Sequence, residues 1–429
     1  MKFRYGKNNI EINLDSKWNF TIHQPVEQKG IENPIAKIKE AINNPIGSLP
    51  LKEIIKNKNN LKKVCIVSSD ATRPVPSNLI LEALIDELNA YGIIDNQITI
   101  IIATGLHRPS YEDEIERILG KNLKGRIKVI NHQANDKDCL IRIGNFNDNN
   151  PILVNKYYAQ SDLKILTGYV EPHFFFGFSG GRKSIVPGIL GAETIQFNHS
   201  AEKINSEYAR FGIYEENPLH KHGIEISKLI GVDFIVNVCI NEHHEIVQIA
   251  AGDLIKAHEK LIEYQKKYIF REIEKPFDIV ICGNGGYPLD LNLYQAVKSM
   301  AIGEMAVKNS GTIIAVNECI DGIGQEKFKE LIFSGMNPSE IHKRILNKEI
   351  IVPDQWEIQI LARILMKAEI FIISKLNQNE IGNIGLKFAE SVEEAIKISL
   401  RKYGKDASIL ILPNGPLVLP LVKLSNITK

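Results

Sequence analysis

The sequence predicts an α/β protein with two domains, each built on a mostly parallel sheet. From residue 61 onward, short runs rich in Val and Ile alternate with amphipathic helical segments, which is the pattern of parallel α/β units. The 429 residues exceed what one typical core organises. Hydrophobic residues make up 44% and charged residues 24%, an ordinary globular balance. We expect an active site in the cleft between the two domains.

The first half contains five expected strands, at residues 62–69, 97–104, 126–132, 162–168 and 232–240. Helices are expected from about Ser77 to Gly92, from about Ser110, and over 254–269. Ser110 and Asp113 resemble a capping box, so we expect the second of these helices to begin at Ser110.

The charged, proline-containing segment "FREIEKPFD" (270–278) predicts a domain boundary. Strands are expected again at 277–283, 311–318, 369–375 and 407–415, with helices from about Asn292, within 325–367 and over 391–404. We therefore predict an N-terminal domain over 1–270 and a C-terminal domain over 271–412. The tail, 413–429, is expected to return to the first domain as one option.

Charge and cysteine content narrow the class of protein. The formal net charge of +1 offers no field that would hold nucleic acid or a membrane surface. The five cysteines are odd in number and form no CxxC pair, as expected in a reducing compartment. The N-terminus lacks the apolar core of a secretory signal, and no run of about 18 apolar residues occurs. We expect a cytoplasmic protein that binds a small molecule.

Four polar clusters directly follow expected strands: "SDATRPVP", "ATGLHRP", "TGYVEPHF" and "GNGGYPLD". Ligands of open α/β sheets bind beyond the carboxyl ends of the strands. These separated segments are therefore expected to form one site.

The loop "GFSGGRKS" (177–184) invites comparison with a phosphate-binding P-loop. That motif needs a glycine directly before its lysine, whereas Arg182 precedes Lys183, and the preceding strand is about ten residues away. A nucleotide triphosphatase is therefore excluded, although backbone N–H groups could still hold one phosphate. The glycines indicate close approach of the backbone to a bulky or anionic group.

The candidate reactive side chains lie in these clusters. His107 and His173 could act as acid and base near neutral pH, or be structural. His199 could be a core residue or a single metal ligand, and Lys183 a site of covalent attachment or phosphate contact. Asp70, Thr72 and Arg73 could bind a phosphate or carboxylate. Gln295 and Lys298 share a helix face, and Trp356 is more typical of core packing.

Together and in this order, "SDATRPVP", "ATGLHRP", "EPHFFFGFSGGRKSIVPGI", "TIQFNH" and "GGYPLDLNLYQAVK" resemble the catalytic component of the nickel-pincer-nucleotide-dependent lactate racemase family. The similarity runs from about residue 61 through the segment of Trp356. It implies that Lys183 is covalently attached to the pyridinium-3,5-bisthiocarboxylic acid mononucleotide nickel complex. It further implies that His199 is a ligand of the nickel and that His107 and His173 are the acid/base pair.

The resemblance also implies the binding residues. Cofactor contacts fall to Asp70, Ala71, Thr72 and Arg73, and substrate contacts to Gln295 and Lys298, with Arg73, Tyr294 and Trp356 as further candidates. Partners would be a small 2-hydroxy acid and the proteins that make and load the cofactor. A homodimer is left open.

The expected reaction is interconversion of D- and L-lactate or a closely related short 2-hydroxy acid. Hydride leaves C2 and returns to the opposite face, while one histidine takes the hydroxyl proton. The alternatives are a racemase or epimerase of malate, 2-hydroxyglutarate or an aldonic acid, a metal-dependent hydrolase with three protein ligands, and a carrier of the cofactor.

Overall fold

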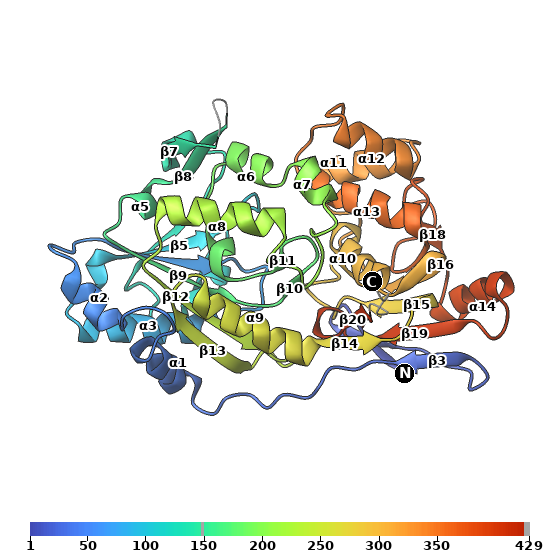
Figure 1. Ribbon diagram of the computed structural model, residues 1–429, viewed down its shortest axis with the longest axis horizontal. Helices are drawn as coiled ribbons and strands as arrows, with labels where there is room; N and C mark the ends of the chain where they lie inside the picture. Colours follow the sequence, from blue (N-terminus) through green and yellow to red (C-terminus); the bar gives the residue numbers. More distant parts are fainter. Residues whose placement is uncertain (147–149, 424–429) are drawn as a thin grey trace, which may run out of the picture. The chain divides into compact units, whose positions relative to one another are not determined.

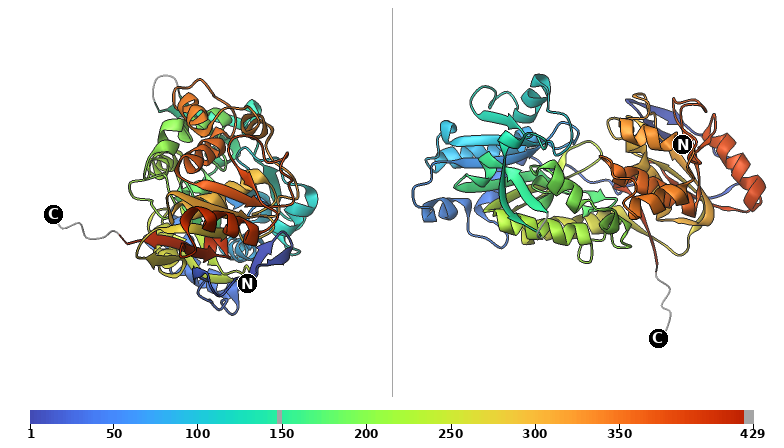
Figure 2. Two further views of the ribbon diagram at one scale, coloured as in Figure 1. Left: turned by 90° about the vertical axis from the view of Figure 1, so that its right-hand side faces the viewer. Right: turned by 90° about the horizontal axis from the view of Figure 1, so that it is seen from above.

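The computed structural model describes residues 1–146 and 150–423 and divides into two compact units. The middle unit is Glu27–Lys267, and the terminal unit joins Met1–Val26 to the chain from Tyr268 onward. Figures 1 and 2 follow the chain from blue to red and show, within each unit, a sheet flanked by helices. The prediction of an α/β fold with mostly parallel sheets is confirmed.

The middle unit contains a six-stranded sheet in the order β13-β12-β9-β4-β5-β6. All neighbouring strands are parallel except β12 and β13. The sheet strands are β4 (Val64–Ser69), β5 (Ile98–Ala103), β6 (Lys128–Asn131), β9 (Leu163–Tyr169), β12 (Phe234–Ile240) and β13 (Ile246–Gly252). Smaller pairs are β7 (Leu140–Asn145) with β8 (Pro151–Asn155), and β10 (Pro172–His173) with β11 (Gly177–Phe178).

The helices of the middle unit cover both faces of this sheet. They are α1 (Pro34–Asn43), α2 (Leu51–Asn57), α3 (Ser77–Ala90), α4 (Glu112–Leu119), α5 (Lys156–Ala159), α6 (Ala192–Asn198), α7 (Ala201–Asn205), α8 (Pro218–Ile230) and α9 (Lys256–Ile269), with 3₁₀ turns η1 (Asp95–Gln97), η2 (Lys137–Cys139) and η3 (Gly181–Ser184). Apolar residues of α1 and α3, such as Ile38 and Leu81, pack on one face of the sheet with Ile66 and Ile165. The turn η3 contacts β9 and α8.

The terminal unit contains a second six-stranded sheet, entirely parallel, in the order β18-β17-β16-β15-β19-β3. Its strands are β3 (Asn19–Ile22), β15 (Phe277–Gly283), β16 (Val307–Val316), β17 (Glu369–Ile373), β18 (Lys387–Phe388) and β19 (Ser408–Leu412). The remaining elements are β1 (Lys2–Tyr5), β2 (Asn8–Glu11), β14 (Phe270–Ile273), β20 (Leu419–Val422), α10 (Leu293–Glu304), α11 (Glu326–Ile332), α12 (Pro338–Leu346), α13 (Gln355–Lys367), α14 (Val392–Tyr403) and η4 (Gly415–Leu417).

The structure differs from the predicted domain bounds in two places. The boundary predicted at residue 270 lies close to Tyr268, but residues 1–26 belong with the C-terminal half. The reason is that β3 pairs with β19, and Phe3 and Ile12 pack into the same core as Val392. The tail also stays in the terminal unit, because β20 pairs with β14; residues 424–429 of the predicted tail lie outside the described residues.

The helix expected from Ser110 begins two residues later. Its N-cap is Tyr111, whose backbone N–H donates to the Glu114 carboxylate at 2.8 Å. Within the described ranges, no helix has both the length and the apolar character needed to span a membrane. All five cysteines are free thiols.

Candidate active site

Two loops that follow neighbouring strands bring Asp70 and His107 together. Asp70 comes directly after β4 and His107 shortly after β5, and these parallel strands end in register, with Ser69 opposite Ala103. His107 Nδ1 lies 2.7 Å from Asp70 Oδ2. A carboxylate only accepts, so His107 donates from Nδ1 and carries its lone pair on Nε2. The pair thus presents a base at the carboxyl edge of the sheet.

Asp70 is held as the carboxylate. Its Oδ1 accepts hydrogen bonds from the Thr72 hydroxyl at 2.6 Å and the Thr72 backbone N–H at 3.2 Å. Burial would raise the pKa of Asp70, but the hydrogen bond and charge of His107, the charge of Arg73 and the Thr72 hydroxyl outweigh it and lower the pKa below its usual value. Asp70 therefore stays charged and can stabilise a protonated His107.

His173 lies on the short hairpin of β10 and β11, opposite Gly177. Its Nδ1 accepts from the backbone N–H groups of Phe175 and Phe176, at 3.4 and 3.3 Å. These bonds are long and therefore weak. Because Nδ1 accepts, the neutral ring carries its proton on Nε2, which is the opposite tautomer to that of His107.

Phe175 and Phe176 form the centre around which three candidate residues gather. The His173 ring lies 4.5 Å from Phe175, and the His199 ring 5.4 Å from Phe175 and 5.3 Å from Phe176, between centroids. Lys183 Nζ lies 4.2 Å from the centroid of Phe176, a cation–π contact. The structure thus brings His173, Lys183 and His199 together, as their common sequence segment predicted.

His199 is suited to ligate a metal. It follows α6, its side chain is buried, and Nδ1 lies 3.1 Å from the carbonyl of Ile195. A carbonyl only accepts, so Nδ1 carries the proton and Nε2 the lone pair. Burial, followed by the charge of Lys183, lowers the pKa of His199 to about 3. The ring is therefore neutral near pH 7, the form that metals require.

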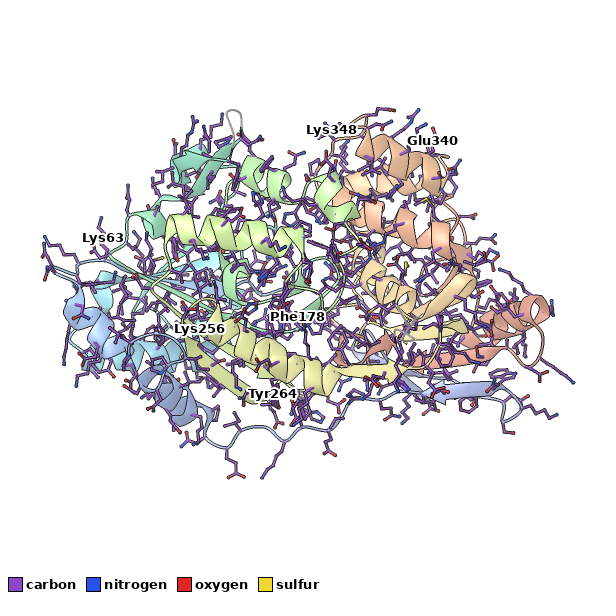
Figure 3. All side chains as sticks on the ribbon, in the orientation of Figure 1. Lys63, Phe178, Lys256, Tyr264, Glu340 and Lys348 are labelled. Atoms are coloured by element: carbon purple, nitrogen blue, oxygen red, sulfur yellow. The ribbon has the colours of Figure 1, made fainter. Side chains whose placement is uncertain are left out.

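Arg182, next to Lys183, is completely buried beneath the loop. Its guanidinium donates to the carbonyls of Phe176, Phe178 and Gly180 at 2.9 to 3.2 Å. Burial lowers its pKa to about 9. It forms no ion pair with a carboxylate of the described chain, so the loop carries positive charge that an anionic ligand would balance. Phe178, marked in Figure 3, is also fully buried.

The loop glycines are needed for packing within the protein. A Cβ on Gly177 would lie 1.9 Å from the carbonyl oxygen of Ile213, and one on Gly188 would lie 2.3 Å from that of Ser184. Those on Gly180 and Gly181 would meet Val170 and His258 at 2.7 and 2.8 Å. The sequence suggested that these glycines make room for a ligand. In the structure, the space that a side chain would need at each of them is filled by other residues of the protein.

The remaining candidates lie in the terminal unit. Asn292 caps the N-terminus of α10, where its side chain accepts from the backbone N–H of Gln295. Lys298 Nζ lies 2.5 Å from Gln295 Oε1, which confirms that Gln295 and Lys298 share one face of α10. Tyr294 packs edge-to-face on Phe328, with centroids 5.6 Å apart. Trp356 is largely buried in the first turn of α13.

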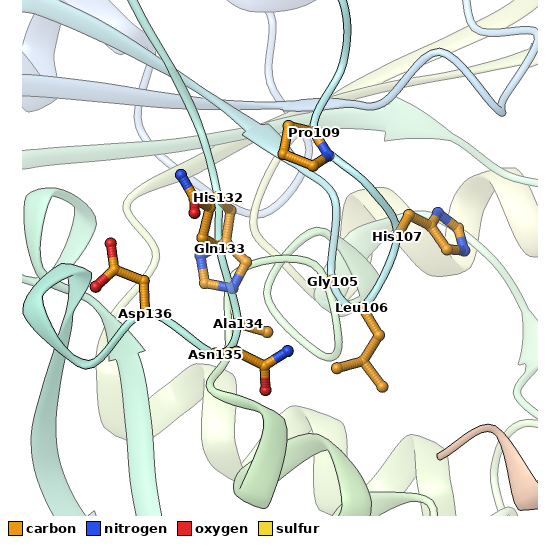
Figure 4. Close-up of a pocket in the computed structure, with 9 residues that line it drawn as sticks. All are labelled: Gly105, Leu106, His107, Pro109, His132, Gln133, Ala134, Asn135 and Asp136. Carbon is orange, nitrogen blue, oxygen red and sulfur yellow. The ribbon is translucent and has the colours of Figure 1, made fainter.

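A pocket of about 330 Å³ opens beside the His107 loop, at the carboxyl ends of β5 and β6. Figure 4 shows the His107 ring pointing away from Gln133 and Asp136, which line the opposite side. His173, Lys183 and His199 do not line it. The backbone N–H of Gly105 nevertheless donates to the Gly188 carbonyl at 3.0 Å, so the His107 loop is tied to the segment that carries Lys183.

Two family models together cover most of the sequence. The lactate racemase N-terminal domain matches residues 5–212 and the lactate racemase C-terminal domain matches residues 273–419. Lactate racemase of Thermoanaerobacterium thermosaccharolyticum is 38% identical over 89% of both chains. The chain belongs to the lactate racemase family. The predicted enzyme class, isomerase, is confirmed, because the relatives that show the family are named lactate racemase.

Further relatives agree. Lactate racemase of Lactiplantibacillus plantarum is 37% identical over 96% of this chain and 97% of its own length. A solved structure of the lactate racemase apoprotein from T. thermosaccharolyticum matches with a TM-score of 0.89 and 35% identity, covering 98% of this chain and 99% of that one. A protein from Thermotoga maritima has a TM-score of 0.67 at 20% identity, covering 93% and 100%, and shows the fold alone.

Sequence reasoning missed the pairing of Asp70 with His107, since it assigned Asp70 to cofactor contact. A signal existed, because both residues follow strands that are consecutive along the expected sheet. It also missed Arg182 as the buried centre of the loop. No local pattern marks an arginine whose partners are three carbonyls, and arginines are seldom buried without an anionic partner.

Proposed function

We propose that this chain interconverts D- and L-lactate, or a closely related short 2-hydroxy acid, using a nickel-pincer nucleotide attached to Lys183. The observation that carries the proposal is the gathering of His173, Lys183 and His199 around Phe175 and Phe176, in a chain of the lactate racemase family. Assignment of the histidines as acid and base belongs to the same proposal.

The residues present fit the nucleotide. His199 offers a buried neutral imidazole whose lone pair lies on Nε2, and imidazole together with soft sulfur suits nickel. Lys183 lies close enough to His199 to affect its pKa. The positive charge of Arg182 favours an anionic group at the loop. Ala71, Thr72 and Arg73 remain the proposed cofactor contacts at the adjacent strand end. Asp70, whose two oxygens already accept from Thr72 and His107, is proposed to act through His107 instead.

When bound, this cofactor supplies an electron-poor centre that can accept and return the C2 hydride of a 2-hydroxy acid. His107 takes the hydroxyl proton on Nε2, and Asp70 stabilises the resulting imidazolium through Nδ1. A protonated histidine gives a proton back to the substrate oxygen when the C2–H bond forms again. His173 starts as a donor from Nε2 and serves the opposite enantiomer as base. For Nε2 to act as a base, the proton must move to Nδ1, which breaks the two weak hydrogen bonds at 3.3 and 3.4 Å and requires the ring to turn Nδ1 away from these two N–H donors.

We assign the substrate carboxylate to Lys298 and Gln295. The Oε1 of Gln295 holds the Lys298 ammonium at 2.5 Å, so the Gln295 amide can donate from Nε2 to a carboxylate oxygen. Arg73, Tyr294 and Trp356 are the further candidates for substrate contact. Fixed donors of this kind orient a substrate without reorganising during the reaction.

The other proposals follow from the family. Malate, 2-hydroxyglutarate and aldonic acids stay as alternative substrates, and cofactor-loading proteins, a homodimer and a cytoplasmic location stay predictions.

The metal-hydrolase alternative needs three clustered protein ligands. No such group of His, Cys, Asp or Glu occurs within residues 1–146 and 150–423.

The first test is peptide mass spectrometry of the Lys183 segment, on protein produced together with the cofactor-making enzymes. We expect a nucleotide-sized adduct on Lys183 and its loss in K183A. The matched control is K203A, because Lys203 also lies over a phenylalanine ring, at 4.3 Å from the Phe197 centroid. An unmodified Lys183 in folded, active protein would refute the attachment.

The second test is a chiral assay of the loaded protein on single enantiomers of lactate, malate and 2-hydroxyglutarate. We expect lactate to racemise from both sides. H107Q and H173Q should keep the adduct and lose roughly 10²- to 10⁴-fold in kcat, as is typical for a general acid or base. Unchanged rates would remove the histidines from the mechanism, and loaded but inactive parent protein would favour a carrier.

A further inference from the structure

Three buried side-chain oxygens of the terminal unit lack a hydrogen-bond donor. Asn284, Asp290 and Asn317 are each at most 1% exposed. In each, the Oδ1 atom meets no donor of the described residues. Buried acceptors of this kind are rare in folded proteins, because leaving them unsatisfied costs free energy. Three at one end of a sheet therefore indicate a ligand.

The orientation of both amides is fixed by their partners. Asn284 Nδ2 donates to the carbonyl of Leu289 and, at 3.1 Å, to that of Gln295. Asn317 Nδ2 donates to the Ser299 hydroxyl at 2.9 Å, and that hydroxyl donates in turn to the Ala296 carbonyl at 2.7 Å. Since these partners must accept, neither amide can be turned over. The unsatisfied atoms are therefore oxygens.

Strand pairing and two hydrogen bonds bring the three side chains close together. Asn284 and Asn317 directly follow β15 and β16, which pair with Gly283 opposite Val316. Leu289, the acceptor for Asn284, precedes Asp290. Asp290 Oδ2 accepts from the backbone N–H of Glu318, the residue after Asn317, at 3.1 Å. Asn284 therefore lies beside Asn317 and contacts the residue before Asp290. Asp290 in turn contacts the residue after Asn317.

We propose that Asn284, Asp290 and Asn317 bind an alkali-metal cation, Na⁺ or K⁺, through their Oδ1 atoms. One water molecule donates only two hydrogen bonds, whereas a cation accepts lone pairs from all three oxygens at once. Amide and carboxylate oxygens are hard ligands of the kind that hard cations take. One carboxylate and two neutral amides balance a single positive charge.

The surroundings favour a cation. Burial raises the pKa of Tyr5, and the nearby carboxylates of Glu318 and Asp290 raise it further. The Glu318 carboxylate lies against Gly6, and the Gly6 N–H donates to Asp290 Oδ2 at 2.7 Å. The cation would join the start of α10 to the ends of β15 and β16. This site goes beyond the proposed function, because no residue of the acid/base or attachment machinery forms it.

The test is the melting temperature of the purified full chain in NaCl, KCl, MgCl₂ and choline chloride at equal ionic strength. We expect a saturable rise of a few degrees in NaCl or KCl over choline chloride. D290N should abolish this rise. In choline chloride D290N should melt at least as high as the parent, because the new amide nitrogen can donate to the two asparagine oxygens while its oxygen keeps the Gly6 and Glu318 bonds.

The control is D278N, the same chemical change elsewhere in the terminal unit. Asp278 pairs with Lys308 at 2.6 Å and accepts from Ser408, so D278N should lower the melting temperature equally in every salt. Equal melting of the parent in choline, sodium and potassium chloride would overturn the proposal and leave water as the occupant. A response to MgCl₂ alone would also overturn it.

Discussion

His107 and Asp70 are 37 residues apart in sequence and 2.7 Å apart in space, joined by a hydrogen bond from Nδ1 to Oδ2. The side chain of Asp70 is 6% exposed and that of His107 is 42% exposed. The buried partner is therefore the charged one, and the accessible partner is the base. This hydrogen bond fixes the tautomer of His107. Asp70 therefore acts by positioning His107 and stabilising its charged form.

Replacing Asp70 by Asn should leave the Lys183 adduct intact but lower kcat. The amide can still accept from His107, yet it supplies no charge to stabilise the imidazolium. We expect a loss of at least about tenfold, towards the ~10²- to 10⁴-fold range of a lost general acid or base. The measurement is kcat of the loaded enzyme.

D162N is the control, since the Asp162 carboxylate accepts from the backbone N–H groups of Lys62 and Lys63 and does not contact His107. Equal kcat for D70N and the parent would contradict the proposed role of Asp70 in stabilising the His107 imidazolium.

Replacing Gly177 by Ala should destabilise the middle unit strongly. Gly177 has a φ of +77°, and its Cβ would lie 1.9 Å from a backbone oxygen that cannot move without the chain. Gly92 has a φ of +89° with nothing within 4 Å of its Cβ. G92A should therefore cost only the left-handed strain of about 1–2 kcal/mol, and G177A roughly 3 kcal/mol or more. The measurement is the free energy of unfolding of both variants in denaturant. Equal losses of this free energy in G177A and G92A would refute the packing argument.

Burial lowers the pKa of His132 to about 4, although the Leu190 carbonyl favours its charged form. The unfolded chain, with a pKa of about 6.5, then binds more protons than the folded chain between these values. The contribution of His132 is fully present above about pH 6.5 and is lost as pH falls towards 4. H132Q keeps a donor and an acceptor but does not titrate. Its unfolding free energy should fall less steeply across this window, by about 1.4 kcal/mol per pH unit. An unchanged slope would argue against a neutral buried ring.

Arg363 of α13 and Glu304 of α10 form a two-fold ion pair, at 3.0 and 2.7 Å, with both side chains 12% exposed. E304Q or R363M should each destabilise the terminal unit by about 3 kcal/mol, because one charge is left buried without its partner. The double variant should recover part of that loss. A double-mutant cycle by denaturant unfolding measures the coupling, and additive losses would show that the pair does not stabilise the packing of α10 on α13.

The amino-acid sequence by itself determined the α/β class, the order of strands and helices, and the loops that carry the candidate site. It could do so because alternating apolar runs and amphipathic helices are local patterns, and because ligands of parallel sheets bind at the strand ends. His173, Lys183 and His199 belong to one segment, so their proximity was also within reach of local reasoning.

Only the tertiary structure decided that residues 1–26 complete the C-terminal sheet, since β3 pairs with a strand almost 400 residues later in the chain. It also decided that Asp70 holds His107, that carbonyls hold Arg182, and that Gly177 faces Ile213. These are contacts between residues far apart in sequence, or between a side chain and backbone. They depend on strand register and packing, which no local pattern of residues encodes.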